Sequence, residues 1–166
     1  MERNLLYSIL LLFTLSTFAK DIPFSKLIHF YNEKRTDLLL DYLKEQGYKV
    51  GTKKKADSKS RATHKISASW YSNHTSNIRM VTIFETSNKI KGIQYKTLSQ
   101  EDFNNCIDSM KKYGFKFKEK FETSMVYEKG TTLVSTDIEQ MVIGGEKHDV
   151  WIFTFLESSL TQIIDK

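Results

Sequence analysis

Twice along this chain the spacing of hydrophobic residues changes from helical to strand-like, and each change falls at a glycine. Residues 99–113 place apolar side chains at helical spacing, and residues 115–121 then largely alternate phenylalanine with lysine, so that Phe115, Phe117 and Phe121 are expected to face the core and the lysines to face water. Gly114 lies between them and can adopt the left-handed conformation that ends a helix. Residues 36–46 and Gly47 repeat this pattern. The sequence therefore predicts two amphipathic helices, each followed by a strand.

Local signals predict the other elements. Ser99 and Thr36 can each accept a hydrogen bond from an exposed backbone amide at the start of a helix. A short earlier helix is expected at Phe24–Tyr31, and Glu128–Thr131 is typical of a hairpin turn. Further strands are expected at Thr63–Tyr71, Ile78–Ser87, Gly92–Thr97, Ser124–Glu128, Thr131–Glu139 and Val150–Glu157.

Two pairs of segments resemble one another and keep their order along the chain. Asp41–Val50 resembles Asp108–Phe117, and Val81–Ser87 resembles Phe153–Ser159. A duplicated unit is the simplest account of both echoes.

The expected fold is therefore α+β. A tandem duplication of an α-β-β-β(-β) unit, with repeats at about 24–90 and 91–160, would form one antiparallel sheet of roughly seven or eight strands with helices packed on one face. The chain has one proline and no Gly/Ser linker between the repeats, so residues 20–166 are expected to form a single domain.

Residues 1–19 have the layout of a signal peptide. Arg3 precedes a short apolar run, and small residues end at Ala19, where cleavage is expected. A retained membrane anchor is the alternative, but the apolar run is shorter than the ~20 residues that a spanning helix needs. We expect an exported protein, periplasmic or secreted and of bacterial type, with no membrane span after cleavage.

Composition adds two constraints. The single cysteine, Cys106, excludes an internal disulfide, so stability must come from core burial. The net charge of +5 favours an acidic partner such as a protein, an anionic polysaccharide or lipid headgroups, and export disfavours nucleic acid. A charge of this size is also ordinary for solubility.

The strands that close each repeat are apolar on both sides. Either they are buried on both sides, or one side forms an exposed patch for a partner. If the helices cover one face only, the interface candidates are Trp151, Phe153, Phe155, Trp70 and Tyr71. A basic stripe on the wet face of the sheet is the second candidate, formed by Lys116, Lys118 and Lys120 with Lys49 and Lys53. Such lysines also discourage unwanted strand pairing.

No specific chemical motif is present. His29, His64, His74 and His148 lack metal-ligand spacing. Cys106 aligns with Leu39 of the first repeat, which favours a quiet buried thiol. Glu85 and Glu157 end the echoed strand segments, which favours a structural task over acid/base chemistry. The sequence predicts no metal, no cofactor and no catalytic residue.

The leading hypothesis is thus a non-catalytic protein that binds another protein through an exposed sheet face. Tandem helix-plus-sheet units resemble the element order of beta-lactamase inhibitor proteins and of small outer-membrane assembly factors, which implies an inhibitor, immunity-type or envelope accessory role. The alternative is a small or lipid-like ligand held between helices and sheet by Phe30, Tyr31, Phe103, Met110 and Phe121. An enzyme would need catalytic side chains to converge from both repeats.

Overall fold

The computed structural model describes residues 21–56, 62–71 and 78–157, without the side chain of Tyr71. The expected signal peptide 1–19 and His74 lie outside these residues. The helices are α2 (Phe24–Glu33), α3 (Thr36–Glu45) and α4 (Gln100–Lys112). The strands are β1 (Lys49–Val50), β2 (Lys54–Lys55), β3 (His64–Tyr71), β4 (Ile78–Thr86), β5 (Lys89–Thr97), β6 (Lys116–Phe121), β7 (Ser124–Lys129), β8 (Thr132–Ile143) and β9 (Glu146–Glu157).

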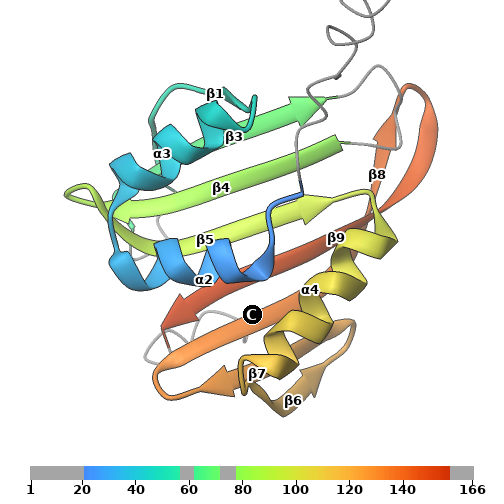
Figure 1. Ribbon diagram of the computed structural model, residues 1–166. Coiled ribbons are helices and arrows are strands. Elements are labelled where there is room, and N and C mark those ends of the chain that lie inside the picture. Colours follow the sequence, from blue (N-terminus) through green and yellow to red (C-terminus); the bar gives the residue numbers. More distant parts are fainter. Residues whose placement is uncertain (1–20, 57–61, 72–77, 158–166) are drawn as a thin grey trace, which may run out of the picture.

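All the strands belong to one antiparallel sheet, which confirms the expected mixed α+β class. Their order is β1-β3-β4-β5-β9-β8-β7-β6, and β2 also pairs with β3. The middle of the sheet joins segments far apart in sequence, because Ile93–Thr97 of β5 pairs with Trp151–Phe155 of β9. Strand β9, the last strand that the structure describes, therefore lies near the centre of the sheet (Figure 1).

The ends of α4 follow the local signals in the sequence. The Ser99 side chain accepts a hydrogen bond from the backbone amide of Asp102 at 3.1 Å. Gly114 follows the helix with a φ of 85°, and Gly47 follows α3 with a φ of 82°. A side chain at either position would be strained, so both glycines direct the chain from a helix into a strand. Thr36 differs from expectation, because it is the first residue of α3 and Arg35 is the N-cap.

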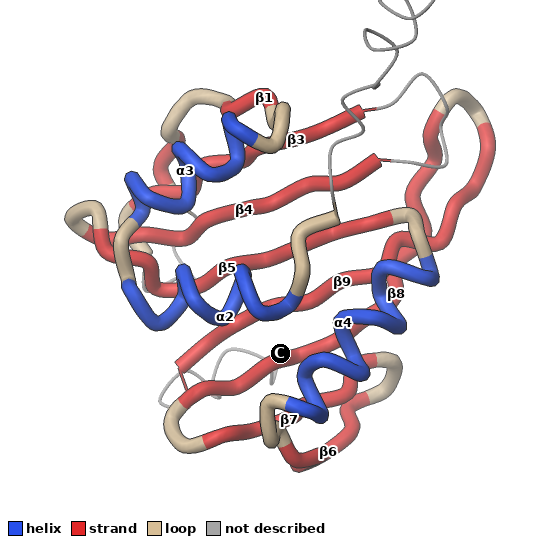
Figure 2. The backbone as a smooth tube through the Cα atoms, viewed as in Figure 1, coloured by secondary structure: helices blue, strands red, loops and turns tan. Residues whose placement is uncertain are grey.

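The core lies between the helices and one face of the sheet. Figure 2 shows the helices in front of the strands. Phe24 of α2 packs on Phe155, with ring centroids 5.4 Å apart, and Phe103 of α4 packs on Phe153 at 4.9 Å. We call this side of the sheet the core face and the opposite side, which carries Thr82, the outer face.

The two sequence echoes occupy different kinds of position. The first echo matches α3 and β1 with α4 and β6, and β1 and β6 lie at the two ends of the strand order. The second echo matches β4 with β9, but β5 lies between these two strands. The strands matched by the first echo therefore hold similar positions, at the ends of the sheet, whereas those matched by the second echo do not.

Strand β6 departs from its predicted alternation. A register shift falls between Phe117 and Glu119, so Lys116 pairs with Glu128 while Lys120 pairs with Met125. Glu128 and Met125 lie on opposite faces of β7, and Lys116 and Lys120 therefore also face opposite sides. Phe117 is 59% exposed, so its expected place in the core was wrong.

Candidate binding surfaces

The aromatic residues predicted to form an exposed patch lie on the core face. Phe153 and Phe155 have no exposed surface. Trp151 is half-buried and contacts Phe103, with ring centroids 4.8 Å apart. Their alternation along β9 aims all three side chains at the helices. They hold helices to sheet, and the expectation of an open aromatic patch there is corrected.

Trp70 and Tyr71 end strand β3. The half-buried ring of Trp70 packs against the core and lies 5.4 Å from the guanidinium of Arg79. Trp70 therefore covers a buried arginine. The side chain of Tyr71 lies outside the described residues.

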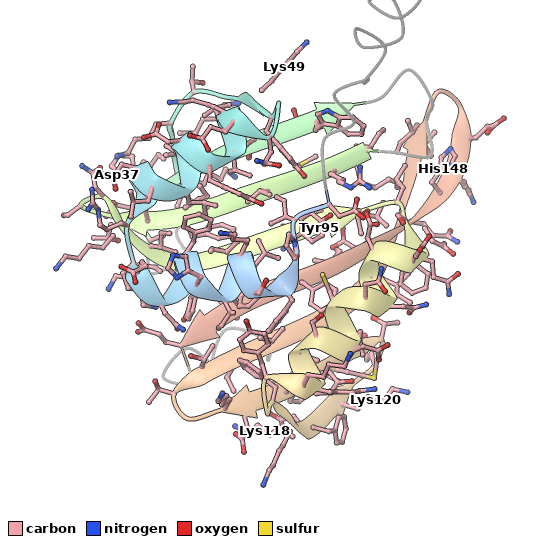
Figure 3. The ribbon with its side chains drawn as sticks, in the orientation of Figure 1. Asp37, Lys49, Tyr95, Lys118, Lys120 and His148 are labelled. Carbon is pink, nitrogen blue, oxygen red and sulfur yellow. The ribbon has the colours of Figure 1, made fainter. Side chains whose placement is uncertain are left out.

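The lysines do not form the predicted stripe. Figure 3 shows Lys49 at one end of the molecule and Lys118 and Lys120 at the other, in keeping with the strand order. The Lys118 ammonium forms an ion pair with the Glu128 carboxylate at 3.4 Å. Lys116 and Lys120 face opposite sides of β6. Because β1 and β6 lie at opposite ends of the sheet, their charges cannot act as one surface.

Most residues predicted to line an apolar ligand pocket are packed in the core. Phe30, Tyr31, Phe103 and Met110 are all buried. Phe121 pairs with Ser124 on the outer face, away from the other four. These five side chains therefore do not enclose a common cavity.

A different hollow lies between α2, the end of α4 and the β7–β8 turn. It has a volume of about 720 Å³ and is lined by both polar and apolar side chains. Ile28 and Phe115 are its buried lining residues, and the exposed His29 and Lys129 lie among the others. Lys129 donates to the backbone oxygen of Tyr113, so its ammonium is already used at the end of α4. The hollow is open and its charged groups do not converge.

A buried ion pair links the start of α4 to the sheet. Arg79 of β4 donates to Asp102 at 2.9 Å, and both side chains are less than a tenth exposed. Thr97 also donates to Asp102, at 3.2 Å, and Arg79 has a second acid partner in Asp21. Each charge thus has an opposite charge beside it, which is the usual arrangement of a structural ion pair.

A buried thiol and a buried phenol that interact with this pair are chemically quiet. Burial and the nearby carboxylates raise the pKa of Cys106 to about 12, so the reactive thiolate is scarce at neutral pH. Burial raises the pKa of Tyr95 well above its usual value. Figure 3 shows Tyr95 between the helices and the sheet.

The remaining titratable candidates are dispersed. His64, the first residue of β3, contacts the preceding Thr63, His29 lies beside the hollow, and His148 lies on the outer part of β9 (Figure 3). No group of three or more possible metal ligands occurs among the described residues. Glu85 is fully buried and pairs with Lys53. Glu157 pairs instead with Lys34, at 3.2 Å.

Three of the six exposed large hydrophobic residues in the described part of the chain lie at the outer ends of β8 and β9. Strand β7 pairs with β8 only as far as Thr136, and β5 pairs with β9 only from Trp151. We call residues 137–150, the outer ends of β8 and β9, the arm (Figure 1). Exposed fractions are 42% for Ile138, 38% for Met141 and 68% for Val142.

The arm also differs from the rest of the chain in charge. It carries four carboxylates, Asp137, Glu139, Glu146 and Asp149, against one lysine, Lys147, whereas the whole chain has a net charge of +5. Met141 and Ile143 line a cavity of only about 30 Å³ with residues of β4 and β5, so part of the arm's outer face contacts its neighbours, although Met141 stays 38% exposed. Its core-face side and the free edge of β8 remain exposed.

A sequence signal for the arm does exist. Gly144 and Gly145 have φ angles of 61° and 90° and form the two-residue turn between β8 and β9. A Gly-Gly pair flanked by strand-forming residues is typical of a hairpin. The expected strands, which ended at Glu139 and began at Val150, were too short because this turn was not recognised.

A scan of protein-family models gives no match for this chain, and neither does a comparison with curated proteins or with solved structures. Within the described residues, no helix has the length and apolar character needed to cross a membrane.

Proposed function

We propose that this is an exported, non-catalytic protein that acts by binding another protein chain, and that the arm is its contact surface. The observation that carries the proposal is the exposure of Ile138, Met141 and Val142 together on one projecting hairpin. Exposed apolar groups rimmed by charged residues are typical of protein contacts. An inhibitor, an immunity-type protein and an envelope accessory factor all fit this role.

We also infer that the chain contains two copies of an α-β-β-β(-β) unit with the helices on one face of the sheet. The strand order supports this, because each half contributes its last strand, β5 or β9, to the centre and its first strand to an end. Matching β5 with β9, instead of β4 with β9, would make the two halves equivalent.

Chemical crosslinking in the producing cell, followed by purification and mass spectrometry, tests the proposed function. Replacing Ile138 and Val142 with serine should remove the crosslinked partner. Leu38→Ser is the matched control, because Leu38 is 37% exposed on α3, away from the arm. An unchanged set of partners in the arm variant would reject the arm as the contact surface.

A small-molecule role is the second candidate, supported by the hollow of about 720 Å³ between α2 and the β7–β8 turn. This volume is in the range of ligand sites. Native mass spectrometry of the protein from its producing cell should then detect an added mass that Ser25→Trp abolishes and Val142→Ser leaves in place. Absence of any added mass would reject this role.

A further inference from the structure

Positive charge gathers at the end of the sheet formed by β6 and β7. Residues 111–129 carry six lysines against three glutamates, whereas the arm is acidic. All six lysines are exposed, and we call them the basic end: Lys111, Lys112, Lys116, Lys118, Lys120 and Lys129. Among the described residues, the Lys118–Glu128 pair is the only ion pair that these lysines form. Most of this charge is therefore free to attract an anionic partner.

The elements that carry these lysines are tied together. Helix α4 ends at Lys112, shortly before β6 begins at Lys116, and β6 pairs with β7. Lys129 of β7 donates to the backbone oxygen of Tyr113, which links the end of α4 to the β6–β7 hairpin. Figure 3 shows Lys118 and Lys120 at this same end of the molecule. The six charges therefore belong to one surface region.

Two exposed aromatic side chains lie within this region. Phe117 of β6 is 59% exposed, and Tyr113 is 43% exposed. The Phe117 ring meets the ring of Tyr127 edge-on, with centroids 5.9 Å apart, and the rest of its surface is open to solvent. Exposed aromatic rings beside cations are typical of surfaces that contact anionic lipid, because the rings enter the headgroup region and the cations attract the lipid phosphates.

The position of β6 in the sheet favours a flat partner. Strand β6 is the last strand in the order, so one of its edges is free. Lys116 and Lys120 face opposite sides of this strand. Long lysine side chains on both sides can extend past the edge and reach a plane that meets the strand edge-on. A partner docked on one face of the sheet would be reached by only part of the charge.

We propose that the basic end binds the surface of an anionic lipid bilayer, with the edge of β6 toward the membrane and Phe117 among the lipid headgroups. This contact is separate from the proposed function, because the arm lies at the top of the molecule and β6 at the bottom in Figure 1. The anionic membrane attracts the basic end and repels the acidic arm. The protein is thereby oriented with the arm directed away from the membrane.

Sedimentation with lipid vesicles tests the membrane contact. The purified protein should bind vesicles made of equal parts phosphatidylglycerol and phosphatidylcholine, and it should not bind vesicles of phosphatidylcholine alone. Binding should weaken steeply as the salt concentration rises to about 0.5 M, because salt screens the attraction between exposed charges. Equal binding to both kinds of vesicle would overturn the inference, since an apolar segment and not the basic end would then hold the protein.

Charge-removing variants locate the contact. Lys116→Gln and Lys120→Gln should each lower the affinity for the anionic vesicles about fivefold, which is the contribution of one lysine close to such a surface. Lys49→Gln is the matched control, because it removes an exposed strand lysine at the other end of the strand order. It should change the affinity less than about twofold, since distant charges are screened. Equal losses in all three variants, or a loss in only one of the two β6 variants, would reject the edge-on contact.

Insertion of Phe117 has a readout of its own. The fluorescence of Phe117→Trp should be quenched by anionic vesicles that carry brominated lipid. The wild type should be quenched little, because its Trp70 and Trp151 are half-buried against the core. Leu38→Trp is the matched control, since Leu38 is exposed on α3. Equal quenching of the two added tryptophans, or none of Phe117→Trp, would contradict the proposed orientation.

Two further measurements distinguish other partners and other surfaces. If the protein ignores anionic vesicles but binds dextran sulfate through Lys116 and Lys120, its partner is a soluble polyanion and the membrane contact is wrong. Replacing Ile138 and Val142 with serine should leave vesicle binding unchanged. A loss of vesicle binding in that arm variant would assign the membrane contact to the arm and overturn the inference.

Discussion

Replacing Phe153 with alanine should strongly destabilise the protein. Phe153 has no exposed surface, lies on the central strand β9 and packs on Phe103 of α4 at 4.9 Å. Burying a phenylalanine contributes about 1.5–3 kcal/mol, and the cavity left by its removal raises the total loss to about 3–5 kcal/mol. That is a large part of the ~5–15 kcal/mol that stabilises a typical domain. The melting temperature should fall by roughly 10 °C.

The chain provides a matched control for this substitution. Phe117 also lies in a strand but is 59% exposed, so Phe117→Ala should cost about 1 kcal/mol or less. Urea unfolding followed by circular dichroism gives the free energy of unfolding of both variants. Equal losses in the two variants, or a loss below about 1.5 kcal/mol for Phe153→Ala, would refute the conclusion that Phe153 is core.

Two further predictions concern charged groups. Asp102→Ala should lower the free energy of unfolding by about 3 kcal/mol, because it leaves Arg79 buried without its main partner. A double-mutant cycle with Arg79→Met measures the coupling, and independent effects would contradict the ion pair. Burial opposes ionisation of Asp137, but hydrogen bonds from Thr123 and Ser124 outweigh it and lower the pKa of Asp137 below its usual value. The ionised Asp137 carboxylate therefore stabilises the folded state above about pH 4, and this stabilisation is lost as the pH falls through the lowered pKa. Asp137→Asn should cost about 1 kcal/mol at neutral pH and converge with the wild type in acid, as unfolding midpoints across pH would show.

Most signals that act within a few residues gave correct predictions, although the expected cap at Thr36 was wrong because Arg35 is the N-cap. Ser99 caps α4, and Gly47 and Gly114 take the left-handed conformation after their helices. Each outcome depends on backbone geometry next to the residue concerned, and that geometry is the same in any fold. The helices and most strands could therefore be placed from the sequence.

Exposure could not be predicted in the same way, because it depends on strand order. Alternation along β9 correctly grouped Phe153 with Phe155 on one face, but it could not show that this face meets the helices. Alternation in β6 correctly placed Phe117 on the core face, where it pairs with Tyr127, but it could not show that β6 lies at the end of the sheet, where Phe117 stays exposed. The edge at Ile138 was hidden for a related reason, since an edge exists only where the neighbouring strand ends.

The position of β9 has a consequence for how the chain folds as it is made. Strand β5 is complete by Thr97, yet the edge that it offers to the sheet centre stays open until residues 151–155 have been synthesised. A nascent chain would therefore expose an apolar edge while residues 98–150 are being made, and such edges aggregate readily. The contact order of this central pairing is high, which slows folding. Because β9 lies between β5 and β8, loss of β9 alone would divide the sheet into two halves and not merely shorten it at one end.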